Sequence, residues 1–250
     1  MAKENLFVCG CARSGTTALA RLLVGSDEIV IGIERYANLS RRDDFRLTPE
    51  LFEKERFFEV REGDTFYASY DESNRFDRRA RMKYDAAKYV GDKLPGLYKS
   101  YEQLFDRFPR AKVIFIYRDP LETASSWMGR LAEKKNWPEK RDYRAAVKEW
   151  NRSMFLTREW LNAGYEIIVV DYDTIFRSDR SLKPLFDLLE VTYTDPLDQG
   201  IGRIRERAQS LDAGRRSLLT DEQKSYVVAE AKSFLVRDLS KLARRIPVER

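Results

Sequence analysis

Short apolar runs alternate with longer stretches of helical spacing along most of the chain. We interpret the apolar runs as buried strands, at residues 5–10, 29–31, 88–93, 112–117 and 166–170. Stretches with apolar residues three or four positions apart predict helices after the turn at residues 10–15, at 98–108, from 120 onward, at 142–163 and from Thr220 to about 243. Strands that alternate with helices predict an α/β fold with a central parallel sheet flanked by helices.

Residues 38–87 break this alternation, because charged and aromatic residues crowd together there without a strand pattern. We expect helices and loops that form a cap or substrate-side insertion on a single domain spanning residues 1–250. Five aromatic residues of this region either stack on a sugar or phenol or belong to the core: Phe57, Phe58, Phe66, Tyr67 and Tyr70. The sequence leaves both interpretations open.

The composition excludes several kinds of site. The chain has no histidine, which rules out a Ser-His-Asp triad, a histidine base and the usual zinc ligand. Its 46 basic and 41 acidic residues give a net charge of +5, which is compatible with an anionic ligand or nucleic acid and selects neither. Cys9 and Cys11 are too close in sequence for an unstrained bridge, and no apolar run approaches about 20 residues. With no signal-peptide pattern either, we expect a reduced, cytoplasmic protein without a membrane span.

A glycine-rich turn joins the first predicted strand to the first predicted helix. Residues 10–17 (GCARSGTT) have the frame G-x-x-x-x-G-x-T. In this geometry backbone N–H groups and a helix N-terminus converge on a phosphate. Nucleotide hydrolases carry a lysine before the last hydroxyl residue, whereas this chain has Thr16 there and Arg13 as the cation of the loop. The loop therefore indicates an anion of lower charge and does not require a metal.

This loop resembles that of sulfotransferases that use 3′-phosphoadenylyl sulfate (PAPS), whose signature is P-R-S-G-T-T, with Ala12 in place of the proline. The resemblance implies a P-loop NTPase-like sulfotransferase fold. It also implies PAPS as donor, adenosine 3′,5′-bisphosphate (PAP) as product, no metal, and a set of loop residues that bind the cofactor: Arg13, Ser14, Gly15, Thr16 and Thr17.

Later segments match further elements of that family. An arginine at the end of a strand, with a serine eight residues on, resembles the pair that holds the 3′-phosphate, and Arg13 is expected to join it. A lysine after a strand resembles the one that neutralises the oxygen leaving with the nucleotide, and a tyrosine resembles the one that closes over the adenosine. A Gly-Arg pair resembles a third nucleotide contact, with Arg216 in place of the family's tryptophan. The residues implied are Arg118 and Ser126, with Arg130 on the same helix face, then Lys93, Tyr172, and Gly214 with Arg215.

Because the chain has no histidine, the base that activates the acceptor must be another residue. Glu34 follows the second predicted strand, at a position similar to the catalytic glutamate of tyrosylprotein sulfotransferases. The alternative is a surface glutamate paired with Arg35. Tyr36 replaces an arginine of the tyrosylprotein enzymes, so a protein tyrosine is not the expected acceptor. We expect in-line sulfuryl transfer to a hydroxyl of a small-molecule or carbohydrate acceptor.

Two other classes of function compete with this interpretation. A small-molecule kinase on a P-loop fold lacks the loop lysine here, and Asp119 is a poor candidate for a magnesium ligand. A non-catalytic nucleotide- or nucleic-acid-binding protein would use the basic excess, but acidic residues interrupt any continuous basic face, so no nucleic-acid partner is expected. The sequence gives no prediction of oligomeric state.

Overall fold

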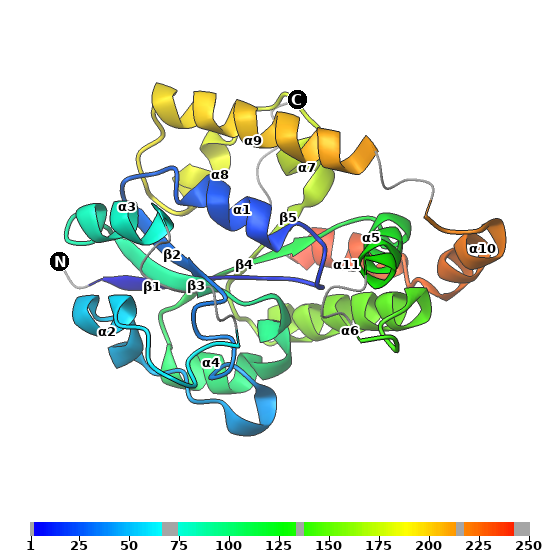
Figure 1. Ribbon diagram of the computed structural model, residues 1–250, viewed down its shortest axis with the longest axis horizontal. Helices are drawn as coiled ribbons and strands as arrows, with labels where there is room; N and C mark the ends of the chain where they lie inside the picture. The colour runs from blue at the N-terminus through cyan, green and yellow to red at the C-terminus, as the bar shows by residue number, and fades with distance from the viewer. Residues whose placement is uncertain (1–2, 67–74, 134–137, 214–217, 243–250) are drawn as a thin grey trace.

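The computed structural model describes residues 3–66, 75–133, 138–213 and 218–242 and contains a five-stranded parallel sheet flanked by helices (Figure 1). The strand order is β2-β3-β1-β4-β5. The strands are β1 (Glu4–Cys9), β2 (Ile29–Ile33), β3 (Tyr89–Lys93), β4 (Lys112–Tyr117) and β5 (Ile167–Asp171). All five predicted strands are confirmed to within two residues, and so is the predicted α/β class.

The first strand lies in the middle of the sheet. It pairs with β3 on one side and with β4 on the other, so the chain leaves it first toward β2 and β3 and later returns toward β4 and β5. A reversal of strand order of this kind opens a crevice at the carboxyl ends of the strands. The turn at residues 10–15 begins at this position.

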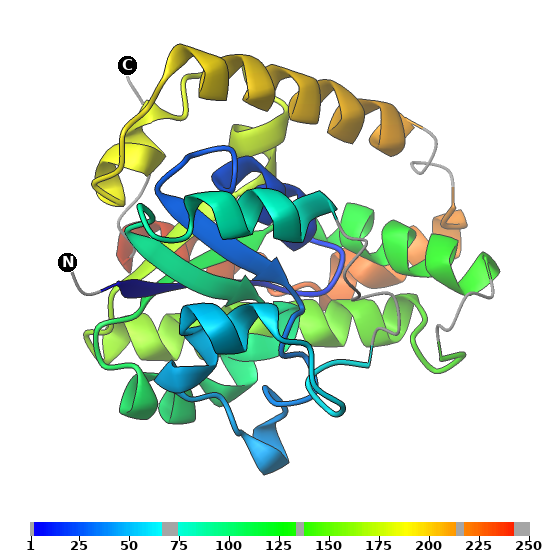
Figure 2. The ribbon, with the colours of Figure 1, turned by 60° about the vertical axis from the view of Figure 1, so that its left-hand side comes forward.

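Helices cover both faces of the sheet (Figure 2). One face carries α1 (Thr16–Leu23), α7 (Tyr172–Phe176), α8 (Lys183–Leu188) and α9 (Asp195–Ala213), and α3 (Arg75–Lys83) lies beside β2. The other face carries α2 (Lys54–Phe58), α4 (Tyr101–Arg107), α6 (Tyr143–Asn162) and the 3₁₀ segments Arg42–Asp44, Pro49–Phe52 and Pro95–Ser100. Against α6 pack α5 (Pro120–Ala132), α10 (Asp221–Glu230) and α11 (Phe234–Leu242).

The core consists of one apolar cluster on each face of the sheet. Alternate residues of β1 supply both clusters, since successive side chains of a strand point to opposite faces: Phe7 to one and Leu6 to the other. Phe57 and Phe58 are buried in the first cluster, which assigns these two aromatic residues to the core. Phe66 is 54% exposed. Tyr67 and Tyr70 lie outside the described residues.

The predicted C-terminal helix from Thr220 to about residue 243 is wrong in its length. The predicted threonine cap is present and forms a capping box with Gln223, but α10 ends at Glu230 and α11 starts at Phe234. The side chain of Asn151 explains the break: it donates to Glu230 O (2.9 Å) and accepts from Lys232 N (2.8 Å). These bonds replace intrahelical ones, so the helix can end there.

The helix predicted at 98–108 starts later than expected, because the chain first forms the 3₁₀ segment Pro95–Ser100.

Cys9 and Cys11 are buried and free, as their spacing predicted. In the described parts of the chain, no helix combines the length and the apolar character needed to cross a membrane.

Candidate active site

The fold places most of the predicted site residues along one edge of the sheet. Because the strands are parallel, their carboxyl ends lie at the same edge. From β2 to β5, this edge carries Glu34, Lys93, the loop of residues 10–17, Arg118 and Tyr172. Residues between 13 and 172 in sequence are thereby brought into one row.

The loop after β1 has the backbone of an anion site. Gly10 and Gly15 have φ of 154° and 93°, and Arg13 has a φ of 74°. A Cβ on Gly10 would lie 2.1 Å from Ile116 O, so only glycine fits there. Among the described residues, no partner accepts a hydrogen bond from the amides of residues 15–17, and no side chain caps α1. Such open amides at a helix N-terminus favour a bound anion.

Two of the predicted cofactor-binding residues carry buried polar atoms without a partner. Within the described part of the chain, the Ser14 hydroxyl and the Arg130 Nε are buried and make no hydrogen bond. Arg130 also donates from Nη1 to Glu133 (3.0 Å). Buried polar atoms are normally paired, so these two donors fit a ligand that carries phosphate oxygens.

Arg13 and Ser126, which are 113 residues apart, meet at the loop. Arg13 Nε donates to Ser126 Oγ (3.2 Å). Arg118 is buried and donates to Glu122 (2.8 Å), and its guanidinium lies 4.2 Å from the centre of the Tyr172 ring. Burial acts to raise the pKa of Glu122, but hydrogen bonds from Arg177 and Arg118 outweigh it and lower that pKa. Arg118 is therefore held in place by a carboxylate before any ligand binds.

Tyr172 supports the loop directly. The ring lies against Gly15, where an added Cβ would come within 2.6 Å of it. Tyr172 is 4% exposed and lines the cavity beside the loop.

Asp119, the weak magnesium candidate, caps α5 by accepting from Glu122 N (3.1 Å). No group of three or more metal-ligating side chains occurs in the described ranges.

Glu34 and Lys93 form an ion pair. Lys93 is 1% exposed and Glu34 is 19% exposed, so the carboxylate is the member of the pair that faces solvent. Burial lowers the pKa of Lys93, while the charge of Glu34 opposes that shift. The alternative pairing of Glu34 with Arg35 is not the one in the structure, since Glu34 pairs with Lys93 and the buried Arg35 pairs with Asp64 at 2.7 Å.

A cavity of about 1340 Å³ extends from the loop along α1 and beneath α9. Its walls include Arg13, Gly15, Thr16, Thr17, Arg118, Ser126 and Tyr172. Of the predicted site residues that the structure describes, those that are not among its lining residues are Ser14, Glu34, Lys93 and Arg130. Gly214 and Arg215, which form the predicted third nucleotide contact, lie outside the described residues.

The sequence analysis missed α9, which contributes Arg203 and Arg207 to the cavity. A signal was present, since Leu197, Ile201, Ile204 and Ala208 have helical spacing and pack on the sheet cluster. Three glycine or proline residues within this helix obscured the pattern, namely Pro196, Gly200 and Gly202. The sequence also did not predict the contacts that hold the turn at Glu34 and Arg35, which come from Asp92, Asp64 and Thr65.

Comparisons with known proteins give a family model and several structural neighbours. Residues 5–195 match the model of a family described as the sulfotransferase family. The sulfotransferase STF9 from Mycobacterium avium aligns with 98% of this chain and 79% of its own, at 15% identity and a TM-score of 0.51. A sulfotransferase from Alicyclobacillus acidocaldarius aligns at 20% identity, 98% and 100% coverage and a TM-score of 0.47. Mouse sulfotransferase SULT7A1 complexed with PAP aligns at 15% identity, 97% and 83% coverage and a TM-score of 0.48. A search of curated proteins gives no match.

Proposed function

The chain belongs to the sulfotransferase family, and we propose that it moves a sulfuryl group from PAPS to a hydroxyl group of a small-molecule or carbohydrate acceptor, with Glu34 as the base. The observation that carries this proposal is the Glu34–Lys93 ion pair, which lies at the same sheet edge as a phosphate loop with open amides. The backbone links the two features, because Gly10 N donates to Pro95 O (3.0 Å) just after Lys93.

The different exposure of the two side chains indicates a separate catalytic role for each. Glu34 faces solvent, so it can accept the proton of an incoming hydroxyl. Lys93 is buried beside the loop and is suited to stabilise the charge that develops on the oxygen leaving with the nucleotide. In an in-line transfer those two oxygens lie on opposite sides of the sulfur. Groups that touch each other cannot serve both oxygens at once, so we expect the pair to separate when substrates bind.

The proposed donor supplies an activated sulfuryl group, and the residues of this chain bind and orient it. The amides and hydroxyls of Ser14, Gly15, Thr16 and Thr17 would hold the 5′-phosphate and sulfuryl oxygens. Arg13, Arg118, Ser126 and Arg130 would hold the 3′-phosphate, since guanidinium groups pair with phosphate in a fork. Tyr172, Gly214 and Arg215 would complete the nucleotide site.

The test is thermal unfolding with and without PAP, in the presence of EDTA. At a PAP concentration about 100 times its dissociation constant, binding adds roughly 2.7 kcal/mol to the free energy of unfolding. For a chain of this length we expect Tm to rise by about 5–10 °C. No shift, or a shift that occurs only with ATP and magnesium, would refute the donor site and favour a kinase.

A further inference from the structure

The backbone of Glu34 has an uncommon conformation. Its φ is 59°, in the left-handed region that non-glycine residues rarely adopt. Glu34 N donates to Lys93 O (2.9 Å), which extends the pairing of β2 and β3 by one residue before the chain turns away. A conformation of this kind persists only where surrounding contacts hold it.

Asp92, on the neighbouring strand β3, supplies two of the contacts that hold this turn. Its two carboxylate oxygens accept from two successive amides of the turn, Arg35 N at 3.1 Å and Tyr36 N at 2.8 Å. Asp92 and Lys93 are neighbours on β3, so their side chains point to opposite faces of the sheet. Asp92 thus binds the turn on one face, while Lys93 meets the Glu34 carboxylate on the other.

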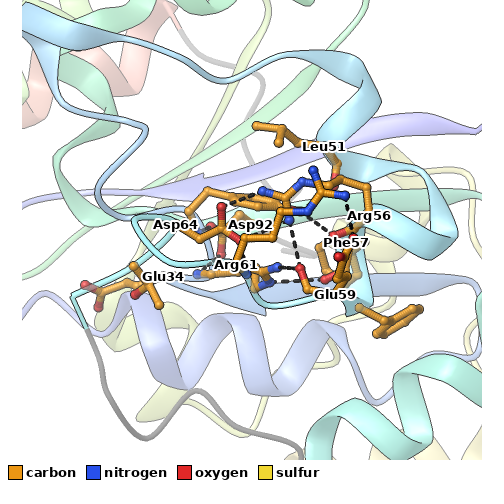
Figure 3. Close-up of polar contacts among 12 residues, drawn as sticks. Glu34, Leu51, Arg56, Phe57, Glu59, Arg61, Asp64 and Asp92 are labelled. Carbon is orange, nitrogen blue, oxygen red and sulfur yellow. Dashed lines mark hydrogen bonds and ion pairs between the residues drawn. The ribbon is translucent and has the colours of Figure 1, made fainter.

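Further contacts hold the same turn from outside. Thr65 Oγ1 donates to Glu34 O (3.0 Å). The Arg35 side chain is buried, pairs with Asp64 and donates to Phe57 O at 3.1 Å. Figure 3 shows Arg56, Arg61 and Asp64 gathered on this side, with the Glu34 carboxylate pointing away from them. The contacts of the Arg35 side chain thus fix the turn and leave the Glu34 carboxylate on the other side.

From these contacts we propose that Asp92 is a positioning residue, which locks the backbone turn after β2 from which the Glu34 carboxylate meets Lys93 in the free protein and reaches the acceptor when substrates bind. The proposal rests on the proposed role of Glu34 as base. Asp92 is fully buried, and burial raises its pKa to about 7 although both amide bonds and Lys93 act to lower it. A carboxylate in such a place weakens folding at neutral pH, so stability alone does not explain it.

The test replaces Asp92 with asparagine, which has the same shape but sets an NH₂ group against one of the two amides. The first readout is the ¹⁵N–¹H correlation spectrum of the lysine ammonium groups. A buried, ion-paired Lys93 should give a slowly exchanging signal in it, and the loss of that signal in Lys93→Arg assigns it. We expect both Asp92→Asn and Glu34→Gln to lose or shift this signal. The matched control is Asp142→Asn, which makes the same substitution at a helix cap that accepts one amide bond, from Ala145 N (2.9 Å) on α6, and should leave the Lys93 signal unchanged.

The second readout is turnover, compared with PAP affinity. We expect Asp92→Asn to reduce kcat by about 10- to 100-fold with unchanged PAP affinity, because a base displaced by about 1 Å can cost that much. In the Glu34→Gln background the same change should have no further effect, since both act through one carboxylate. Additive losses in the double variant, or a wild-type Lys93 signal in Asp92→Asn, would overturn the proposal.

The two proposals fail in different ways. If the wild-type protein neither binds PAP nor transfers sulfuryl groups, the proposed function fails, yet the Lys93 signal still reports whether Asp92 positions Glu34. If Asp92→Asn does not fold, Thr65→Val takes its place, because it removes the hydroxyl bond to Glu34 O. A Lys93 signal and kcat unaffected by Thr65→Val would then refute the locked turn.

Discussion

Replacing Asp92 with asparagine should alter the pH dependence of stability in a defined direction. The carboxyl group has a pKa of about 7 in the folded chain and about 3.8 when exposed, because it is fully buried. Between these two pH values the folded state holds a proton that the unfolded state has lost. Stability of the wild-type protein therefore falls as pH rises from about 4 to about 7 through this group, and the contribution is constant above that range. Asparagine does not titrate and lacks this dependence.

The size of the effect follows from the pKa difference. Each pH unit within the window changes the free energy of unfolding by about 1.4 kcal/mol, so the full effect is about 4 kcal/mol. Between pH 5 and pH 7 the variant should gain about 2–3 kcal/mol relative to the wild type, or roughly 5–10 °C in Tm for a chain of this size. The amide bond lost in the variant adds a constant cost of about 1 kcal/mol, which shifts the difference without changing its slope.

The assay is urea unfolding of both proteins in one buffer series from pH 5 to pH 8. Titration of every other carboxyl group occurs in both proteins and largely cancels from the difference. A difference that stays constant across the series would refute the reasoning, because it would mean that Asp92 is already ionised in the folded protein at pH 5.

Three further substitutions test the site and its support. Lys93→Ala should lower kcat by at least about 100-fold in a transfer assay and leave PAP affinity within a few fold, if Lys93 stabilises the developing charge as proposed. Gly15→Ala should abolish the PAP-induced rise in Tm, since its Cβ would lie 2.6 Å from the Tyr172 ring on a backbone with φ of 93°. Asp64→Asn should lower the free energy of unfolding in urea by about 3–5 kcal/mol, because it removes the carboxylate charge that compensates the buried Arg35 guanidinium.

Each of these changes has a control in the same chain. Lys183→Ala and Asp187→Asn break an exposed pair and should change unfolding and transfer little. Gly96→Ala adds a Cβ with no atom within 4 Å and should keep the PAP response. Equal losses of binding and kcat in Lys93→Ala would make that lysine structural. A PAP response retained by Gly15→Ala, or a small effect of Asp64→Asn, would contradict the geometry described above.

Local patterns were sufficient to predict the strands and the residues that follow them. The glycine turn, the Arg-Asp-Pro start of α5 and the threonine cap of α10 are short signals that depend on neighbouring residues alone. The positions of Glu34 and Lys93 at strand ends could be predicted for the same reason. The break between α10 and α11 could not, because Asn151, which stabilises it, is about 80 residues away.

The chain's own sequence thus determined the α/β class, the glycine-rich turn after β1 and which residues stand at the ends of strands, because each depends on the order of residues within a short segment. Tertiary structure alone decided the strand order, which sets β2 and β3 side by side and brings Glu34 against Lys93. It also decided that Arg35 pairs with Asp64, and that Asp92 binds the turn beside Glu34. These contacts join residues 29 to 59 positions apart, and a contact over that separation forms only when packing of the whole sheet compensates the lost chain entropy.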